Sequence, residues 1–160
     1  MKKILIIYIL LSAIVYSKDI KVYYLNEKLR THFEDNDLYN NKADLEGIEL
    51  VNNKGYGILY LRGINSFYDE INALAVTRKI DSKINKLSYW LGAGGVMGYK
   101  RENIVHDKHG NRYKITLNQV MDNGFCPLVF IGISYKIYDR VLLDLTLIDK
   151  AILGTFRIEI

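Results

Sequence analysis

Residue types that often stabilise or extend small proteins are nearly missing from this sequence. Its 160 residues include one cysteine, Cys126, so an intramolecular disulfide is excluded and the chain is no disulfide scaffold. They include one proline, Pro127, which argues against a flexible linker protein. The formal charge of +4 is small, and nucleic-acid binding requires a clustered basic face, so we expect no nucleic-acid partner. The length suits one domain.

Residues 1–17 have the composition of a secretory signal peptide. Two lysines precede an apolar stretch, and Tyr16 and Ser17 follow it before Lys18. A membrane anchor is the alternative, but the apolar part of about 13 residues is shorter than the roughly 20 that a spanning helix needs. We therefore expect residues 1–17 to be a cleaved signal peptide and residues 18–160 to form a single domain.

The apolar residues of that domain repeat with a period of two, which is typical of β-strands rather than helices. Positions 101–125 are polar and predict one long loop with a possible short strand at 113–117. The other segments predict eight strands, at 19–33, 45–51, 57–64, 70–79, 87–99, 128–138, 141–148 and 152–160.

The two faces of these strands differ in composition, and this difference separates membrane barrels from soluble ones. One parity carries Leu, Ile, Val and Tyr with almost no glycine, whereas the other holds most of the glycines and small residues. We assign the first parity to lipid, so that Leu25 and Leu59 are expected to face the membrane and polar residues the lumen. Tyrosines expected at the membrane interfaces are Tyr23, Tyr89, Tyr99 and Tyr135. Charges expected to pair across the lumen are Glu49, Arg62, Asp144, Arg157 and Glu159.

The sequence thus predicts an all-β, eight-stranded antiparallel up-and-down transmembrane β-barrel of the outer-membrane type. Apolar residues at the last, third-last and fifth-last positions fit the pattern read by the outer-membrane assembly machinery, a predicted partner. The usual terminal residue is aromatic, whereas here it is Ile160. A secreted, lipocalin-like binder of apolar ligands is the soluble alternative.

Several segments of the domain follow one another in a recognisable order. They are DLYNNKADLEGIEL (37–50), INSFYDEI (64–71), LGAGGVMGYK (91–100), CPLVFIGISY (126–135), VLLDLTLIDK (141–150) and the closing FRIEI. In this order they resemble the lipid A palmitoyltransferase (PagP) family and its shorter phage-borne relatives. The similarity spans most of the domain and is one of pattern more than of identity.

This resemblance implies an outer-membrane enzyme that moves an acyl chain from a phospholipid to lipid A. By position, the family's histidine corresponds to His32, and its Asp-Ser pair corresponds to Asn65 and Ser66. The serine is kept, whereas the acid is an amide here; an amide can orient an imidazole but cannot stabilise its charged form. The alternative interpretation is that Asn65 and Ser66 only form a turn and that His32 is a solvated loop residue. A non-catalytic membrane barrel is then the second functional class.

Small residues on the inward parity are candidates for an acyl-chain pocket, although they would equally allow a narrow barrel to close. These residues are Ala73, Ala75, Thr77, Gly92 and Gly94.

His106 and His109 have a spacing that could hold a metal with Asp107, but no further ligand is near in sequence, so a polar loop is favoured. We expect no metal, no cofactor, membrane lipids as partners and a monomer.

Overall fold

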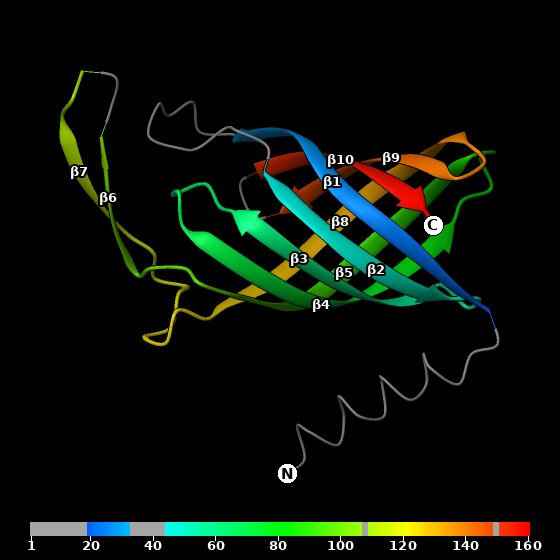
Figure 1. The fold of residues 1–160 in the computed structure, drawn as a ribbon, viewed down its shortest axis with the longest axis horizontal. Coiled ribbons are helices and arrows are strands. Elements are labelled where there is room, and N and C mark those ends of the chain that lie inside the picture. The colour runs from blue at the N-terminus through cyan, green and yellow to red at the C-terminus, as the bar shows by residue number, and fades with distance from the viewer. Residues whose placement is uncertain (1–18, 33–43, 107–108, 149–150) are drawn as a thin grey trace, which may run out of the picture.

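The computed structural model describes residues 19–32, 44–106, 109–148 and 151–160 (Figure 1). The predicted signal peptide, residues 1–17, and the predicted strand end at Phe33 lie outside these residues. Within the described ranges, no helix is long and apolar enough to cross a bilayer.

Eight strands close into a barrel in the order β1-β10-β9-β8-β5-β4-β3-β2, and each strand is antiparallel to both neighbours. The prediction of an all-β, eight-stranded antiparallel up-and-down barrel is therefore confirmed. Pairing of β1 with β10 removes free sheet edges, which are sites of aggregation. The strands are β1 Ile20–His32, β2 Leu45–Asn52, β3 Tyr56–Ile64, β4 Glu70–Asp81, β5 Leu87–Met97, β8 Cys126–Tyr138, β9 Val141–Ile148 and β10 Ala151–Glu159.

A separate two-stranded hairpin lies in the connection between β5 and β8. It consists of β6 Glu102–His106 and β7 Arg112–Thr116 and projects away from the barrel wall in Figure 1. The single loop predicted for 101–125 is therefore wrong, although the possible strand at 113–117 overlaps β7. We call the barrel end that carries this hairpin, the β3–β4 turn and the end of β1 the serine rim.

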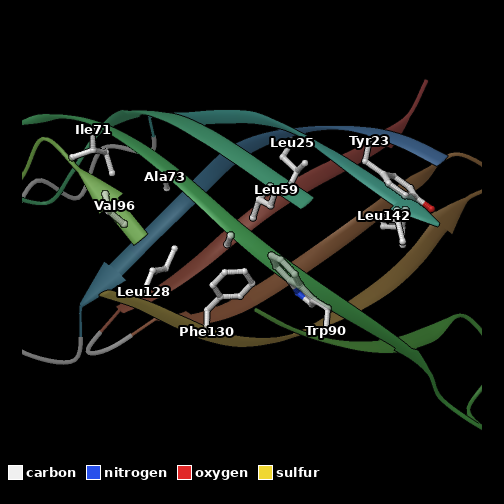
Figure 2. Packing of buried hydrophobic residues seen from close by; sticks show 12 residues of the cluster. Tyr23, Leu25, Leu59, Ile71, Ala73, Trp90, Val96, Leu128, Phe130 and Leu142 are labelled. Carbon is white, nitrogen blue, oxygen red and sulfur yellow. The ribbon is translucent and has the colours of Figure 1, made fainter. Parts of the chain in front are cut away.

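Apolar side chains fill part of the lumen. Leu25, Leu59, Trp90 and Phe130 are buried there and point toward one another (Figure 2). The rings of Trp90 and Phe130 meet edge to face, with centroids 4.8 Å apart. An eight-stranded lumen is narrow enough for side chains to fill it.

The assignment of faces is correct for most strands and wrong for β1 and β3. On β8, Val129 and Ile131 point outward, as predicted, while Phe130 points inward. Leu25 and Leu59 were expected to face lipid but are 2 % and 1 % exposed in the lumen. The physical reason is that a dry, packed lumen needs large apolar side chains as well as small and polar ones.

Three of the five predicted lumenal charges form a buried cluster. Arg157 Nη1 lies 2.7 Å from Glu49 Oε2, and its Nε lies 2.8 Å from Asp144 Oδ2. The guanidinium also lies 4.3 Å from the ring centroid of Trp90. The prediction is wrong for Arg62, which pairs on the outer wall with a carboxylate of β2.

Glu159 also pairs away from this cluster, with Lys21 at the rim opposite the serine rim.

Of the four tyrosines predicted at the membrane interfaces, two lie on the outer wall and two do not. Tyr89 and Tyr135 are exposed on the outer wall, as expected for interfacial residues. Tyr23 points into the lumen and is buried, and Tyr99 packs against the core cluster, so neither belongs to an outer girdle.

Candidate active site at the barrel mouth

The turn between β3 and β4 presents Ser66 on a well-bonded tip. Asn65 N donates to Asp69 O at 2.9 Å, and Tyr68 N donates to Asn65 O at 3.2 Å. The Asn65 side chain accepts two further backbone hydrogen bonds at Oδ1, from Phe67 N at 2.8 Å and Asp69 N at 2.9 Å. Asparagine is favoured at such a position because its short amide can bond its own backbone further along. Asn65 is buried, whereas Ser66 is only partly covered.

His32 approaches this tip because β1 extends beyond its neighbour. The pairing of β1 with β2 runs as far as Asn26 beside Glu46, and β2 begins at Leu45. On its other side β1 remains paired with β10 as far as His32 beside Ala151. The last residues of β1 therefore pass the start of β2 toward the β3–β4 turn.

The histidine and the serine meet at the serine rim. His32 Nε2 lies 2.7 Å from Ser66 Oγ, and both residues are partly buried. This distance is within the range in which a histidine acts as a general base on a hydroxyl. The nitrogen accepts the serine proton when the imidazole is neutral with its hydrogen on Nδ1. The pairing of these two predicted residues is a feature of the fold, since 34 positions separate them in sequence.

Asn65 is held differently from the acid of a serine triad. Its Oδ1 already accepts two backbone N–H groups, so its remaining hydrogen-bonding capacity is the donor group Nδ2. A triad places an acceptor behind the histidine. The role of Asn65 in orienting the imidazole stays a prediction, and Asn65 could fill it only by donating a hydrogen bond from Nδ2.

A buried carboxylate three residues after Ser66 anchors the turn to the segment that follows β5. Asp69 Oδ1 lies 2.6 Å from Lys100 Nζ, and Lys100 N donates to Asp69 Oδ2 at 3.4 Å. Hydrogen bonding to this carboxylate raises the pKa of Lys100 above its usual value. The sequence contained no local signal for this pair because its partners lie on different elements.

A second buried pair supports the start of β2, and the sequence interpretation missed it as well. Arg30 donates from Nε and Nη2 to the two carboxylate oxygens of Glu27, at 2.8 and 2.6 Å. Glu27 Oε2 also accepts from the backbone N of Asp44 and of Leu45, at 3.1 and 3.0 Å. A register shift between Glu27 and Leu29 brings both partners to the inner side of β1.

Three of the predicted pocket residues lie on the inward face of β4. Ala73, Ala75 and Thr77 are buried there. Thr77 Oγ1 donates to Glu49 at 2.5 Å, so it belongs to the lumenal charge cluster.

The two predicted pocket glycines are on β5, where neighbours occupy the space beside them. A Cβ at Gly92 would lie 2.2 Å from the Phe130 ring, and one at Gly94 would lie 2.1 Å from the backbone oxygen of Leu74. Both positions therefore need glycine for packing. Their acyl-binding role, like that of the β4 residues, stays a prediction.

The lumen contains a small apolar cavity between these walls. Its volume is about 30 Å³, and its lining includes Leu25, Leu59, Trp90 and Phe130. Pockets that hold a small-molecule ligand have volumes of about 300–1,000 Å³. In this structure the cavity therefore lacks the volume for an acyl chain.

His106 ends β6, and Asp107 lies outside the described residues. Among the residues that the structure describes, no group of three or more His, Cys, Asp or Glu side chains could hold a metal ion.

No protein-family model matches the sequence, and no curated protein matches it. Among solved structures, Neisserial surface protein A is similar at a TM-score of 0.40 and 11 % identity, covering 88 % of this chain and 96 % of that one. The attachment invasion locus protein Ail of Yersinia pestis is similar at a TM-score of 0.34 and 12 % identity, covering 88 % of this chain and 93 % of that one. A second Ail structure, in complex with the heparin analogue sucrose octasulfate, has the same TM-score and 11 % identity. Likenesses this low say nothing about function.

Proposed function

We propose that the protein is an outer-membrane barrel that uses Ser66 as a nucleophile on the acyl ester of a phospholipid. The acyl group passes to lipid A or to water. The observation that carries this proposal is the 2.7 Å contact between His32 Nε2 and Ser66 Oγ at the mouth of the barrel. The segment order similar to the lipid A palmitoyltransferases supports the choice of acyl chemistry and of lipid substrates.

The outer wall supports the membrane location. Consecutive outward positions of β8 are apolar and exposed: Val129 at 73 %, Ile131 at 56 % and Ile133 at 42 %. Neighbouring strands continue this surface with Tyr89 and Leu91 on β5 and with Leu145 and Leu147 on β9. A contiguous apolar surface of this kind is rare on soluble monomers and typical of a wall that meets lipid.

The proposed reaction has two steps. Ser66 Oγ attacks the ester carbonyl carbon while His32 Nε2 takes the hydroxyl proton, and the ester C–O bond then breaks. His32 returns the proton to the departing lysophospholipid alcohol, which leaves an acyl-serine. A hydroxyl of lipid A, or water, then attacks the acyl-serine, gives its proton to His32, and releases Ser66 when the proton is returned.

This reaction is tested by mass spectrometry of the lipids of cells that express the protein. The wild type should produce acylated lipid A or lysophospholipid, and Ser66→Ala should abolish either product by removing the nucleophile. Ser82→Ala is the matched control, because Ser82 also lies in a turn between strands, where its Oγ accepts from Ile84 N. An unchanged lipid profile with the wild type would contradict the enzymatic proposal.

A non-catalytic membrane barrel is the second candidate, and two observations favour it. The cavity in the lumen is only about 30 Å³, and the Asn65 oxygen is committed to the turn. For this candidate the lipid profiles of the wild type and of Ser66→Ala are identical.

Solubility without detergent distinguishes the soluble, lipocalin-like alternative from a membrane barrel. We expect the barrel to require detergent or lipid, because its apolar outer wall would otherwise meet water. A chain that remains monomeric in detergent-free buffer would contradict the membrane location.

A further inference from the structure

A row of polar side chains crosses the outer wall near the serine rim. Asn26 of β1 lies beside Glu46 of β2, Glu46 beside Arg62 of β3, and Arg62 beside Asn72 of β4. We call these four residues the polar row. The next outward position of β2 is Ile48, which is exposed and apolar.

The polar row is hydrogen-bonded yet remains open to its surroundings. Arg62 donates from Nε and Nη2 to Glu46 Oε1, at 2.9 and 2.6 Å, and Tyr24 donates to Glu46 Oε2 at 3.2 Å. The Arg62 and Glu46 side chains are 66 % and 39 % exposed. An arginine on the lipid face destabilises a barrel by about 2–4 kcal/mol at the bilayer midplane but by only about 0–1 kcal/mol near its surface. The polar row therefore belongs at the level of the lipid headgroups.

A hollow of about 260 Å³ lies at the β1 end of this row, where β2 begins. Its described lining is polar apart from one leucine, and it consists of Asn26, Glu27, Lys28, Asp44, Leu45 and Glu46. Glu27 is 4 % exposed and committed to Arg30 and to two backbone N–H groups.

The other two carboxylates of the hollow suit a ligand that donates hydrogen bonds. The Asp44 residue is exposed. Glu46 accepts three hydrogen bonds in this structure, and a carboxylate has about four acceptor positions. A cation held here can therefore be recognised through its N–H groups. Lys28, an exposed member of the same lining, suits a neighbouring phosphate.

We propose that this hollow binds the headgroup of an ethanolamine phospholipid, with the primary ammonium against Asp44 and Glu46 and the phosphate beside Lys28. A primary ammonium carries three N–H donors, whereas the trimethylated ammonium of choline carries none and cannot make these bonds. The inference rests on the proposed membrane location and is independent of the chemistry at Ser66.

The test uses the full barrel in nanodiscs that contain equal amounts of phosphatidylethanolamine, phosphatidylcholine and phosphatidylglycerol. Native mass spectrometry then measures which lipids remain bound to the protein after it is released from the nanodisc. The wild type should retain phosphatidylethanolamine over phosphatidylcholine by about tenfold, which corresponds to about 1.4 kcal/mol. Asp44→Asn should reduce this preference at least several-fold, because it removes the charge while keeping the shape.

Glu159→Gln is the matched control, since it removes the carboxylate of an exposed ion pair, Lys21–Glu159 at 3.0 Å, at the opposite rim. It should keep the wild-type preference. Equal retention of the two zwitterionic lipids by the wild type would overturn the inference, as would stronger retention of phosphatidylglycerol. Failure of the wild type to enter nanodiscs would overturn the membrane location and this inference together, whereas entry without headgroup preference would overturn this inference alone.

Discussion

At the residue scale, the candidate site depends on how one asparagine is used. The side-chain oxygen of Asn65 accepts two backbone hydrogen bonds within the turn and thereby fixes the position of Ser66. Ser66 Oγ then lies 2.7 Å from His32 Nε2. Asn65 therefore has a structural task in the turn that either an amide or a carboxylate can perform. Substitutions of Asn65 therefore test the stability of the turn independently of the chemistry of Ser66.

We expect Asn65→Ala to lower the free energy of unfolding by about 1–2 kcal/mol, because two backbone N–H groups lose their acceptor. Asn65→Asp should change it much less, since a carboxylate accepts the same two bonds. Urea titration in detergent, followed by the fluorescence of Trp90, the single tryptophan, measures both variants. Equal destabilisation by alanine and aspartate would show that the oxygen at this position does not hold the turn.

At the scale of elements, β1 determines the geometry of the mouth. It pairs with β10 along its whole outer end, passes the start of β2, and carries His32 at its last position. The bidentate pair of Glu27 and Arg30 lies at the step where β2 begins, and both side chains are only 2 % exposed. A buried carboxylate that loses its partner is strongly destabilising.

We expect Arg30→Met to lower the free energy of unfolding by about 3–5 kcal/mol, because Glu27 is left as an uncompensated buried charge. The double variant Glu27→Gln with Arg30→Met should recover most of this loss, since a neutral amide is far less costly to bury than an unpaired carboxylate. The same urea titration compares the two. If the double variant were as unstable as the single one, the charge of Glu27 would not be the cause.

At the scale of the whole molecule, the lumen has an apolar region and a charged region that adjoin, since Leu25 lies beside Arg157 and Leu59 beside Glu49 in the strand register. Leu25, Leu59 and Phe130 contribute to the first, and Arg157 pairs with two carboxylates in the second. Trp90 contacts both regions, through Phe130 and through Arg157. Any acyl chain that entered the lumen would have to displace this ring packing.

Trp90 therefore reports directly on where the acyl chain lies. If the chain enters the lumen during the proposed reaction, a phospholipid with a brominated acyl chain should quench Trp90 fluorescence in the wild type. Phe130→Leu should increase the quenching, because a smaller side chain enlarges the cavity beside the indole. Absence of quenching in an active enzyme would place the chain in the surrounding membrane instead.

The alternation of residues along the chain was sufficient to predict the barrel strands and most of their orientations. On β8 the large apolar residues Ile131, Ile133 and Tyr135 alternate with Gly132 and Ser134, and this contrast predicted the outward face correctly. The pattern failed on β1, where Leu25 faces the lumen, and it missed the hairpin of β6 and β7. Alternation identifies two faces, but it does not say which one a narrow lumen will accept when both carry apolar side chains.

By itself, the sequence determined that this chain forms antiparallel strands of alternating faces, because a period of two is a local property of the backbone. Its resemblance to the lipid A palmitoyltransferases made His32 and Ser66 candidates. Only the tertiary structure decided that they touch, because their contact requires that β1 pass the start of β2 and that the turn fix Ser66 beside it. It likewise brought Glu46 and Arg62 together on the outer wall, since strand register is a relation between segments and not a property of either one.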